Sequence, residues 1–191
     1  MVLDKLNWVD LVIIILLSRI CYIAVRSGLL TELFKLLGIV LAAYLSMHYY
    51  IVFSAYLSGR LGLKNIFGNF MDTISFLLLA IIGYLVFVGL RIVFVKFIKA
   101  ESTPGLHKWG GIIVGTARGF ILASMFVFIL AIAGPDYLHK SVVDSFSGRY
   151  WVKVGSGLYY GIWNNVMSRF MSAEKFNKGI TEVRKGLSVK K

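Results

Sequence analysis

The chain has 191 residues, of which 58% are hydrophobic, and a formal net charge of +12. Soluble domains are about 45–50% apolar, so a soluble protein of this composition could not cover its surface with polar groups. The composition therefore predicts a membrane protein in contact with the lipid bilayer, and the length predicts a single domain. The basic residues mostly flank apolar runs or lie near the C-terminus. This placement is typical of membrane orientation and anionic headgroups, so we expect no nucleic-acid partner.

Four apolar stretches are long enough to cross a bilayer, which takes about 20 helical residues. They run approximately over residues 8–25, 29–50, 72–98 and 110–133. Each should be helical, because backbone in lipid must satisfy its own hydrogen bonds. Only Arg26, Ser27 and Gly28 separate the first two stretches, which predicts a tight helical hairpin. Residues 51–71 form the second predicted link, and Pro104 and Gly105 predict a turn in the third.

The pattern changes after Pro135. Between Trp151 and Phe170, apolar residues recur at intervals of three or four and make one helical face. This spacing favours an amphipathic helix lying in the membrane interface; the alternatives are a fifth, partly inserted helix and a helix docked on the bundle. The last residues are basic and polar and predict a flexible tail. The predicted fold is therefore an all-α membrane protein with a four-helix transmembrane domain (residues 1–135), an amphipathic interfacial segment (136–172) and a basic tail (173–191).

Several ionisable residues lie inside the predicted spans, where they are energetically costly and usually face the bundle, a wet cavity or the interface. Because successive spans alternate in direction, Glu32 lies roughly 6 Å from the side of the first and third links, Arg19 about 10 Å and Arg118 about 13 Å. A lone carboxylate at such depth favours protonation, so we expect Glu32 to pair with a cation between helices. The predicted intramembrane charge cluster comprises Arg19, Arg26, Glu32 and Arg118. The alternative, considered for Lys35 and Arg91, is that the cations snorkel to the near interface.

The fourth stretch carries Gly111, Gly115 and Gly119 at strict four-residue spacing. Glycine at this spacing lets another helix backbone approach closely, so we interpret these residues as helix-packing positions. The three histidines are scattered without an acidic partner at ligand spacing, and we find no metalloprotease, nucleophile-elbow or phosphate-loop motif. The single cysteine excludes an internal disulfide. We therefore expect no enzymatic activity, no cofactor and no metal, and we identify no small-molecule substrate.

The distribution of cations near span ends favours one orientation. The side of the first and third links carries eight, Arg19, Arg26, Lys35, Arg91, Lys96, Lys99, Lys108 and Arg118. The other side carries four, Lys5, Arg60, Lys64 and Lys140. Cytoplasmic segments near span ends are enriched in cations, so this comparison places the two links in the cytoplasm and both termini outside. Counting the cations of the C-terminal tail reverses the balance.

Three groups of residues resemble the colicin V production protein (CvpA) family. Asn7-Trp8-Val9-Asp10 resembles the start of the family's first helix, and Arg26-Ser27-Gly28-Leu29-Leu30-Thr31-Glu32-Leu33 resembles its R-x-G-x-x-x-E-L element. Leu106-His107-Lys108-Trp109-Gly110, followed by Gly115-Thr116-Ala117-Arg118-Gly119, resembles its N-R-x-x-G…G-x-x-R-G element. The chain departs from that pattern at His107, where Asn or Asp is usual, and at Lys108. The resemblance covers about residues 7–134.

The resemblance implies a multi-pass protein of the bacterial inner membrane that supports peptide-toxin production or export and envelope homeostasis. Membrane-protein partners or a homo-oligomer are expected for such an accessory protein. The alternative is a small homo-oligomeric channel or transporter that uses the charged cluster. A continuous wetted path lined by Arg19, Glu32 and Arg118 would favour the channel, whereas a dry, glycine-packed bundle would favour the accessory protein.

Overall fold

The computed structural model describes residues 7–60, 68–97, 104–171 and 174–187. All regular secondary structure within these ranges is helical. Four long helices, α1 (Trp8–Ser27), α2 (Leu29–Arg60), α4 (Met71–Phe97) and α5 (Pro104–Ile132), each contain a segment long and apolar enough to cross a membrane. The predicted fold class, an all-α membrane protein with four spans, is therefore confirmed.

The hairpin between α1 and α2 turns at Gly28, whose φ of 74° lies in the region that favours glycine. Two helix ends differ from the prediction. Helix α2 does not stop near Tyr50 but continues to Arg60, because hydropathy marks the depth of the bilayer and not the end of the helix. Pro104 and Gly105 open α5 instead of forming a turn. Proline suits the first helical turn, where its missing N–H has no intrahelical partner.

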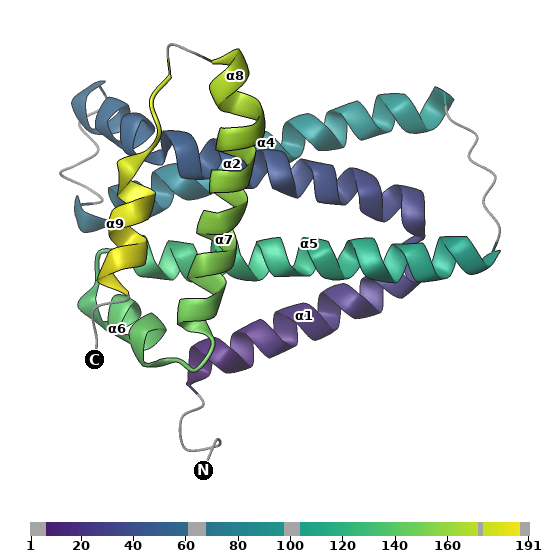
Figure 1. The fold of residues 1–191 in the computed structure, drawn as a ribbon, viewed down its shortest axis with the longest axis horizontal. Coiled ribbons are helices and arrows are strands. Elements are labelled where there is room, and N and C mark those ends of the chain that lie inside the picture. The colour runs from purple at the N-terminus through teal and green to yellow at the C-terminus, as the bar shows by residue number, and fades with distance from the viewer. Residues whose placement is uncertain (1–6, 61–67, 98–103, 172–173, 188–191) are drawn as a thin grey trace.

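Helix α5 lies at the centre of the bundle (Figure 1). Helices α1 and α2 diverge from their hairpin, α5 fills the space between them, and α4 packs chiefly along α2. The largest buried side chains of the spans include Met47, Phe76, Val127 and Phe128, which come from α2, α4 and α5. The hydrophobic core therefore lies toward the end of the bundle opposite the hairpin.

The C-terminal third of the chain folds onto that end of the bundle. It contains α6 (Asp136–Asp144), α7 (Gly148–Ile162), a π-helical turn η3 (Trp163–Met167), the short α8 (Ser168–Phe170) and α9 (Lys178–Gly186). Helix α7 runs steeply across the spans and packs against α5 (Figure 1). Its buried residues include Trp151, Val152 and Tyr159. The predicted amphipathic helix is thus present, and its apolar face is docked on the bundle.

The basic tail predicted from residue 173 onward differs from the structure, which places α9 within it. Ile180 is fully buried, and Leu187 is 2% exposed. Val183 packs against the same cores. These three residues share one face of a helix, and burying that face holds the segment in place despite its charge. We refer to residues 136–171 and 174–187 as the cap.

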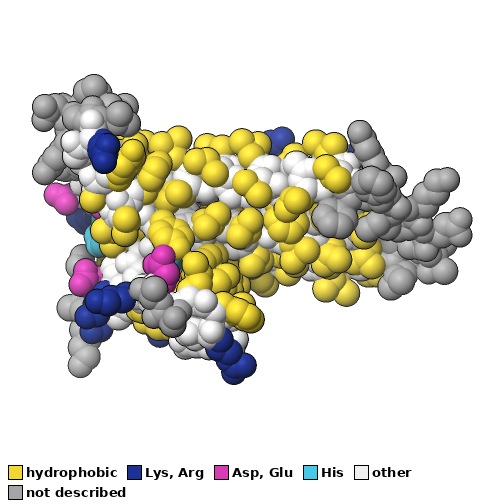
Figure 2. All heavy atoms as spheres, turned by 90° about the horizontal axis from the view of Figure 1, so that it is seen from above, with side chains coloured by type: hydrophobic (Ala, Val, Ile, Leu, Met, Phe, Trp, Pro, Cys, Tyr) yellow, Lys and Arg dark blue, Asp and Glu magenta, His cyan; other side chains and the backbone are white. Residues whose placement is uncertain are grey.

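Polar and apolar side chains separate along the molecule (Figure 2). The flank of the bundle is covered with hydrophobic side chains, whereas acidic and basic groups gather at the end that carries the cap. Such a division suits a body immersed in lipid and a cap at the water interface. The chain is therefore a multi-pass membrane protein.

Candidate functional site

The central feature of the bundle is a buried carboxylate held by two cations. Glu32, in the first turn of α2, is 0% exposed. Its Oε2 lies 3.0 Å from Nη2 of Arg118 on α5, and its Oε1 lies 2.7 Å from Nζ of Lys35. Lys35 also donates a hydrogen bond of 3.0 Å to the Ser27 hydroxyl at the end of α1. Residues from three helices thus meet around one acid, and the group carries a net charge of +1.

The other two cations of the predicted cluster lie elsewhere. Arg19 and Arg26 are exposed, and the Arg26 guanidinium stacks over the Tyr22 ring at 4.5 Å. The buried face of α1 contains Ile20 and Ala24, and Arg19 lies off that face because each residue turns a helix by about 100°. The structure therefore brings Glu32 and Arg118 together, leaves Arg19 and Arg26 outside, and adds Lys35.

The glycines of α5 bring α1 against this group. A Cβ on Gly115 would overlap the Cβ of Ala24 and come within 3.3 Å of Oε2 of Glu32. A Cβ on Gly111 would lie 3.0 Å from the Ala24 carbonyl oxygen, and one on Gly119 would lie 3.1 Å from Leu17. These distances are tighter than ordinary van der Waals contact. All three glycines therefore face α1, and Gly115 closes one side of the carboxylate.

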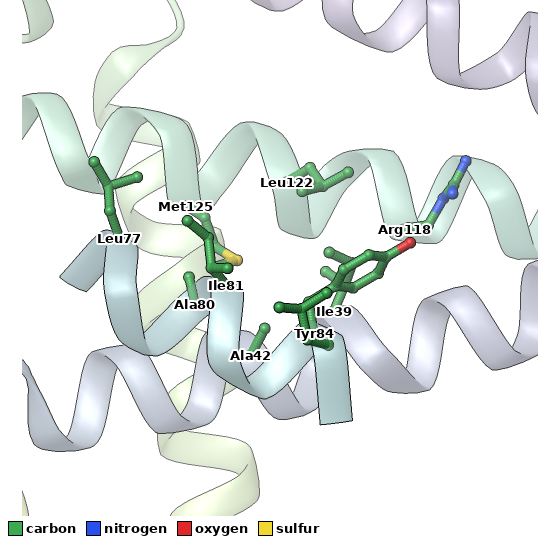
Figure 3. Close-up of a pocket in the computed structure, with 10 residues that line it drawn as sticks. Ile39, Ala42, Leu77, Ala80, Ile81, Tyr84, Arg118, Leu122 and Met125 are labelled. Atoms are coloured by element: carbon green, nitrogen blue, oxygen red, sulfur yellow. The ribbon is translucent and has the colours of Figure 1, made fainter. Parts of the chain in front are cut away.

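A cavity of about 380 Å³ lies on the other side of Arg118, between α2, α4 and α5. Figure 3 shows Arg118 at one end of this cavity, Leu77 and Met125 at the other, and Tyr84 beside Arg118. Among the described residues that line it, Arg118 is the only charged one. Ordered water needs two to four polar partners, which these apolar walls do not supply. The cavity therefore resembles a space for lipid or apolar side chains more than a hydrated path.

The arrangement determines what the site can do chemically. Glu32 is an acceptor whose two oxygens already face cations at 2.7 and 3.0 Å. Within the described residues, no group of three His, Cys, Asp or Glu side chains could hold a metal ion. Buried ion pairs contribute less to stability than to holding one specific arrangement in some proteins. We interpret the Glu32 group as a lock that fixes α1, α2 and α5 relative to one another.

A second carboxylate, Asp10, ties the start of α1 to the cap. It is 3% exposed. It accepts hydrogen bonds from the backbone N–H groups of Phe146 and Ser147 at 3.1 and 2.9 Å, and from the Ser147 hydroxyl. Two nearby residues reinforce the contact. The N-cap residue Asn7 donates from Nδ2 to the Ser141 carbonyl, and Trp8 donates from Nε1 to the Ser141 hydroxyl. Sequence reasoning missed this role, although Asp10 was a visible acid in the first turn of an apolar helix.

A third polar group surrounds His48, which is 5% exposed on α2. The Tyr159 hydroxyl accepts a hydrogen bond of 3.1 Å from the Asn177 N–H and faces His48 Nδ1 at 2.7 Å. The hydroxyl can therefore donate its own proton to Nδ1 in the tautomer in which that nitrogen is an acceptor. Nε2 faces Glu174 Oε2 at 3.3 Å, and Tyr49 donates to the other oxygen of Glu174 at 3.2 Å. His48 thus has an acidic partner 126 residues away, which no local spacing could reveal.

This network fastens the segment 174–177 to α2. Asn177 donates from Nδ2 to the Met47 carbonyl at 2.7 Å, and its Oδ1 caps α9 by accepting the Gly179 N–H at 3.0 Å. The His48 ring stacks on Trp163, with the ring centroids 5.1 Å apart. Burial raises the pKa of Tyr159 to about 12, although the hydrogen bond from Asn177 opposes the rise. The phenol therefore remains a neutral donor throughout the physiological range.

Comparison with known proteins agrees with this architecture. The family model described as colicin V production protein matches residues 9–156, which are 148 of the 191 residues. The match includes Asp10, Glu32 and Arg118, and it extends past Pro135 through α6 and most of α7, farther than the motifs of the sequence indicated. No curated protein and no solved structure matches the chain. Because the family model covers well over half of its length, the chain belongs to the colicin V production protein family.

Proposed function

We propose that the protein is an accessory protein of the bacterial inner membrane that supports colicin V production or export and envelope homeostasis by binding partner proteins. Membership of the family supports a membrane accessory role in colicin V production.

The proposal rests mainly on one observation, that Glu32 is buried and paired with cations and does not line an open path. A transport pathway needs polar groups along a continuous hydrated route, as in pores and transporters lined by charged or carbonyl groups. Here Glu32 is fully buried and paired with Arg118 and Lys35, Gly115 packs against α1 beside it, and Arg19 lies outside. A closed, glycine-packed bundle favours a scaffold that presents fixed surfaces to partners over a channel.

Two measurements test the proposal together. In a colicin V-producing bacterium that lacks its own family member, expression of this chain should restore toxin release, measured as the zone of growth inhibition around colonies. Purified protein in liposomes should not raise ion or dye flux above that of empty liposomes. Full toxin release without the protein would contradict the accessory role. Flux that disappears in the Glu32→Gln variant would favour the channel or transporter alternative.

A further inference from the structure

A second cavity, of about 450 Å³, lies where the cap meets α2. One wall is apolar and consists of Ile51 and Val52, which are 42% and 67% exposed. The opposite wall comes from residues 174–182 of the cap and is polar. The hydrogen bonds of the His48 network join α2 to residues 174–177, so they hold the two walls at a fixed separation. Four members of that network, His48, Tyr49, Glu174 and Asn177, are among the residues that line the cavity.

The depth of this cavity follows from helix length. Twenty helical residues span about 30 Å, the thickness of the hydrocarbon core, so a core that begins at Leu29 ends near His48. The headgroup region of each leaflet adds roughly 5–8 Å. Residues 49–52 rise about 6 Å beyond His48 and therefore lie within the headgroup region. Trp8, 20 residues before Gly28 on α1, lies at the same level, as interfacial tryptophans do.

The cavity is lined by equal numbers of ammonium and carboxylate groups, and most of them form no ion pair among the described residues. Lys175 and Lys178 supply two ammonium groups, and Glu174 and Glu182 supply two carboxylates. Lys175, Lys178 and Glu182 form no ion pair with any residue that the structure describes. Glu174 binds Tyr49 and His48, and its side chain remains 38% exposed. A carboxylate can accept about four hydrogen bonds, so it retains capacity for a further donor.

We propose that this cavity binds the headgroup of a zwitterionic, amine-bearing phospholipid. The lysines face the phosphate, the glutamates accept the ammonium group, and the lipid chains leave along Ile51 and Val52. Carboxylate acceptors favour a primary ammonium, which donates three hydrogen bonds, over a quaternary one, which donates none. An anionic lipid without an amine would leave both carboxylates without a cation. The bound lipid joins α2 to the cap at the point where the membrane ends.

The test uses the full chain in detergent and three probes, short-chain phosphatidylethanolamine, short-chain phosphatidylglycerol and glycerophosphoethanolamine, with binding followed by native mass spectrometry. Wild type should bind phosphatidylethanolamine most tightly. The double variant Lys175→Gln/Lys178→Gln should weaken that binding by about fivefold for each ammonium removed. Glu182→Gln should weaken it as well and reduce the preference over phosphatidylglycerol. Lys185→Gln, an exposed change on the same helix and outside the cavity, should leave binding unchanged.

Each other outcome overturns the proposal. Equal binding of the two lipids would make this an anionic-lipid site or no site at all. Equal binding of glycerophosphoethanolamine would make it a site for a soluble ligand. Unchanged affinity in both the lysine and the glutamate variants, each with the melting temperature of wild type, would exclude the cavity as the place of binding.

Discussion

Replacing Glu32 should destabilise the bundle much more than replacing Arg118, although the two residues form one ion pair. The reason is that Glu32 has two cationic partners and Arg118 has one acidic partner among the described residues. In Glu32→Leu, the Arg118 side chain, which is 10% exposed, loses that partner. In Arg118→Met, Glu32 keeps Lys35 at 2.7 Å.

The magnitudes follow from the cost of leaving a buried charge unpaired. Removing one partner of a buried pair destabilises a protein by about 3–5 kcal/mol, which is the expectation for Glu32→Leu. Arg118→Met removes one of the two cations that face Glu32 and leaves the hydrogen bond from Lys35, so the expected cost is smaller, about 1–3 kcal/mol. The double variant replaces the interhelical pair by apolar side chains of similar size, so no unpaired Arg118 remains, although Lys35 still loses Glu32. It should therefore be more stable than Glu32→Leu alone, with a coupling energy of at least about 2 kcal/mol.

The assay is a double-mutant cycle on purified protein in one detergent, with the free energy of unfolding measured by denaturant titration and the melting temperature as a second readout. Lys35→Met provides the matched comparison, because it removes the other cation and leaves Arg118 in place. Two results would refute the idea that an unpaired Arg118 destabilises the Glu32→Leu variant. One is additive effects of the two single changes on the free energy of unfolding, and the other is an equal loss in Arg118→Met and Glu32→Leu.

Four further predictions concern helix packing beside Glu32, two contacts of the cap and the orientation in the membrane. Gly115→Leu should lower the folded yield in detergent, because its side chain would displace α1. Gly89→Leu should not, since a Cβ at Gly89 meets no other part of the described structure within 4 Å apart from the adjacent backbone of its own helix. Equal yields would contradict the packing. Asp10→Asn should cost about 1–3 kcal/mol, because an amide can replace only one of the two accepting oxygens, and hydrogen exchange should then rise in residues 141–147 before it rises in the spans. The pKa of Tyr159 is about 12 against an ordinary 10. The phenol is therefore neutral in the folded and unfolded states below pH 10. Between pH 10 and 12 it ionises only in the unfolded chain, which lowers the free energy of unfolding by up to about 3 kcal/mol. The melting temperature of Tyr159→Phe should therefore fall less than that of wild type over this pH range. A reporter enzyme active only outside the cytoplasm should be active when fused after Lys191, and activity only from a fusion near residue 105 would invert the orientation.

The spans were predictable because hydropathy reports directly on contact with lipid. The pairing of Glu32 with Arg118 was predictable for a related reason, since a scarce acid and a cation at similar depth in one leaflet have few other partners. Arg19 shares that depth but not the helical phase, which depth alone cannot distinguish. Lys35 was considered as a cation that snorkels to the interface, but it pairs with Glu32. Its position three residues after Glu32 on one helix is a spacing at which two side chains meet.

The cap was harder to predict because its contacts join distant parts of the chain. The pairs His48–Glu174 and Asp10–Ser147 are separated by 126 and 137 residues, so no local pattern relates them. Composition also misleads here, since the charges of residues 173–191 predict a solvated tail. The available signal was the spacing of Ile180, Val183 and Leu187, three apolar residues on one helical face within a charged sequence.

The contact between Asp10 and the cap imposes an order on assembly. Asp10 leaves the ribosome early, but the backbone groups that it binds are 136 and 137 residues later in the chain. At about 5–20 residues per second, synthesis of that interval takes about 7 to 27 seconds. Throughout this time Asp10, at the start of the first helix, lacks the hydrogen bonds from Phe146 and Ser147. Formation of this contact is therefore one of the last steps of biogenesis. A chain that stops before Ser147 would keep all four spans, but Asp10 would lack the hydrogen bonds that Ser147 donates.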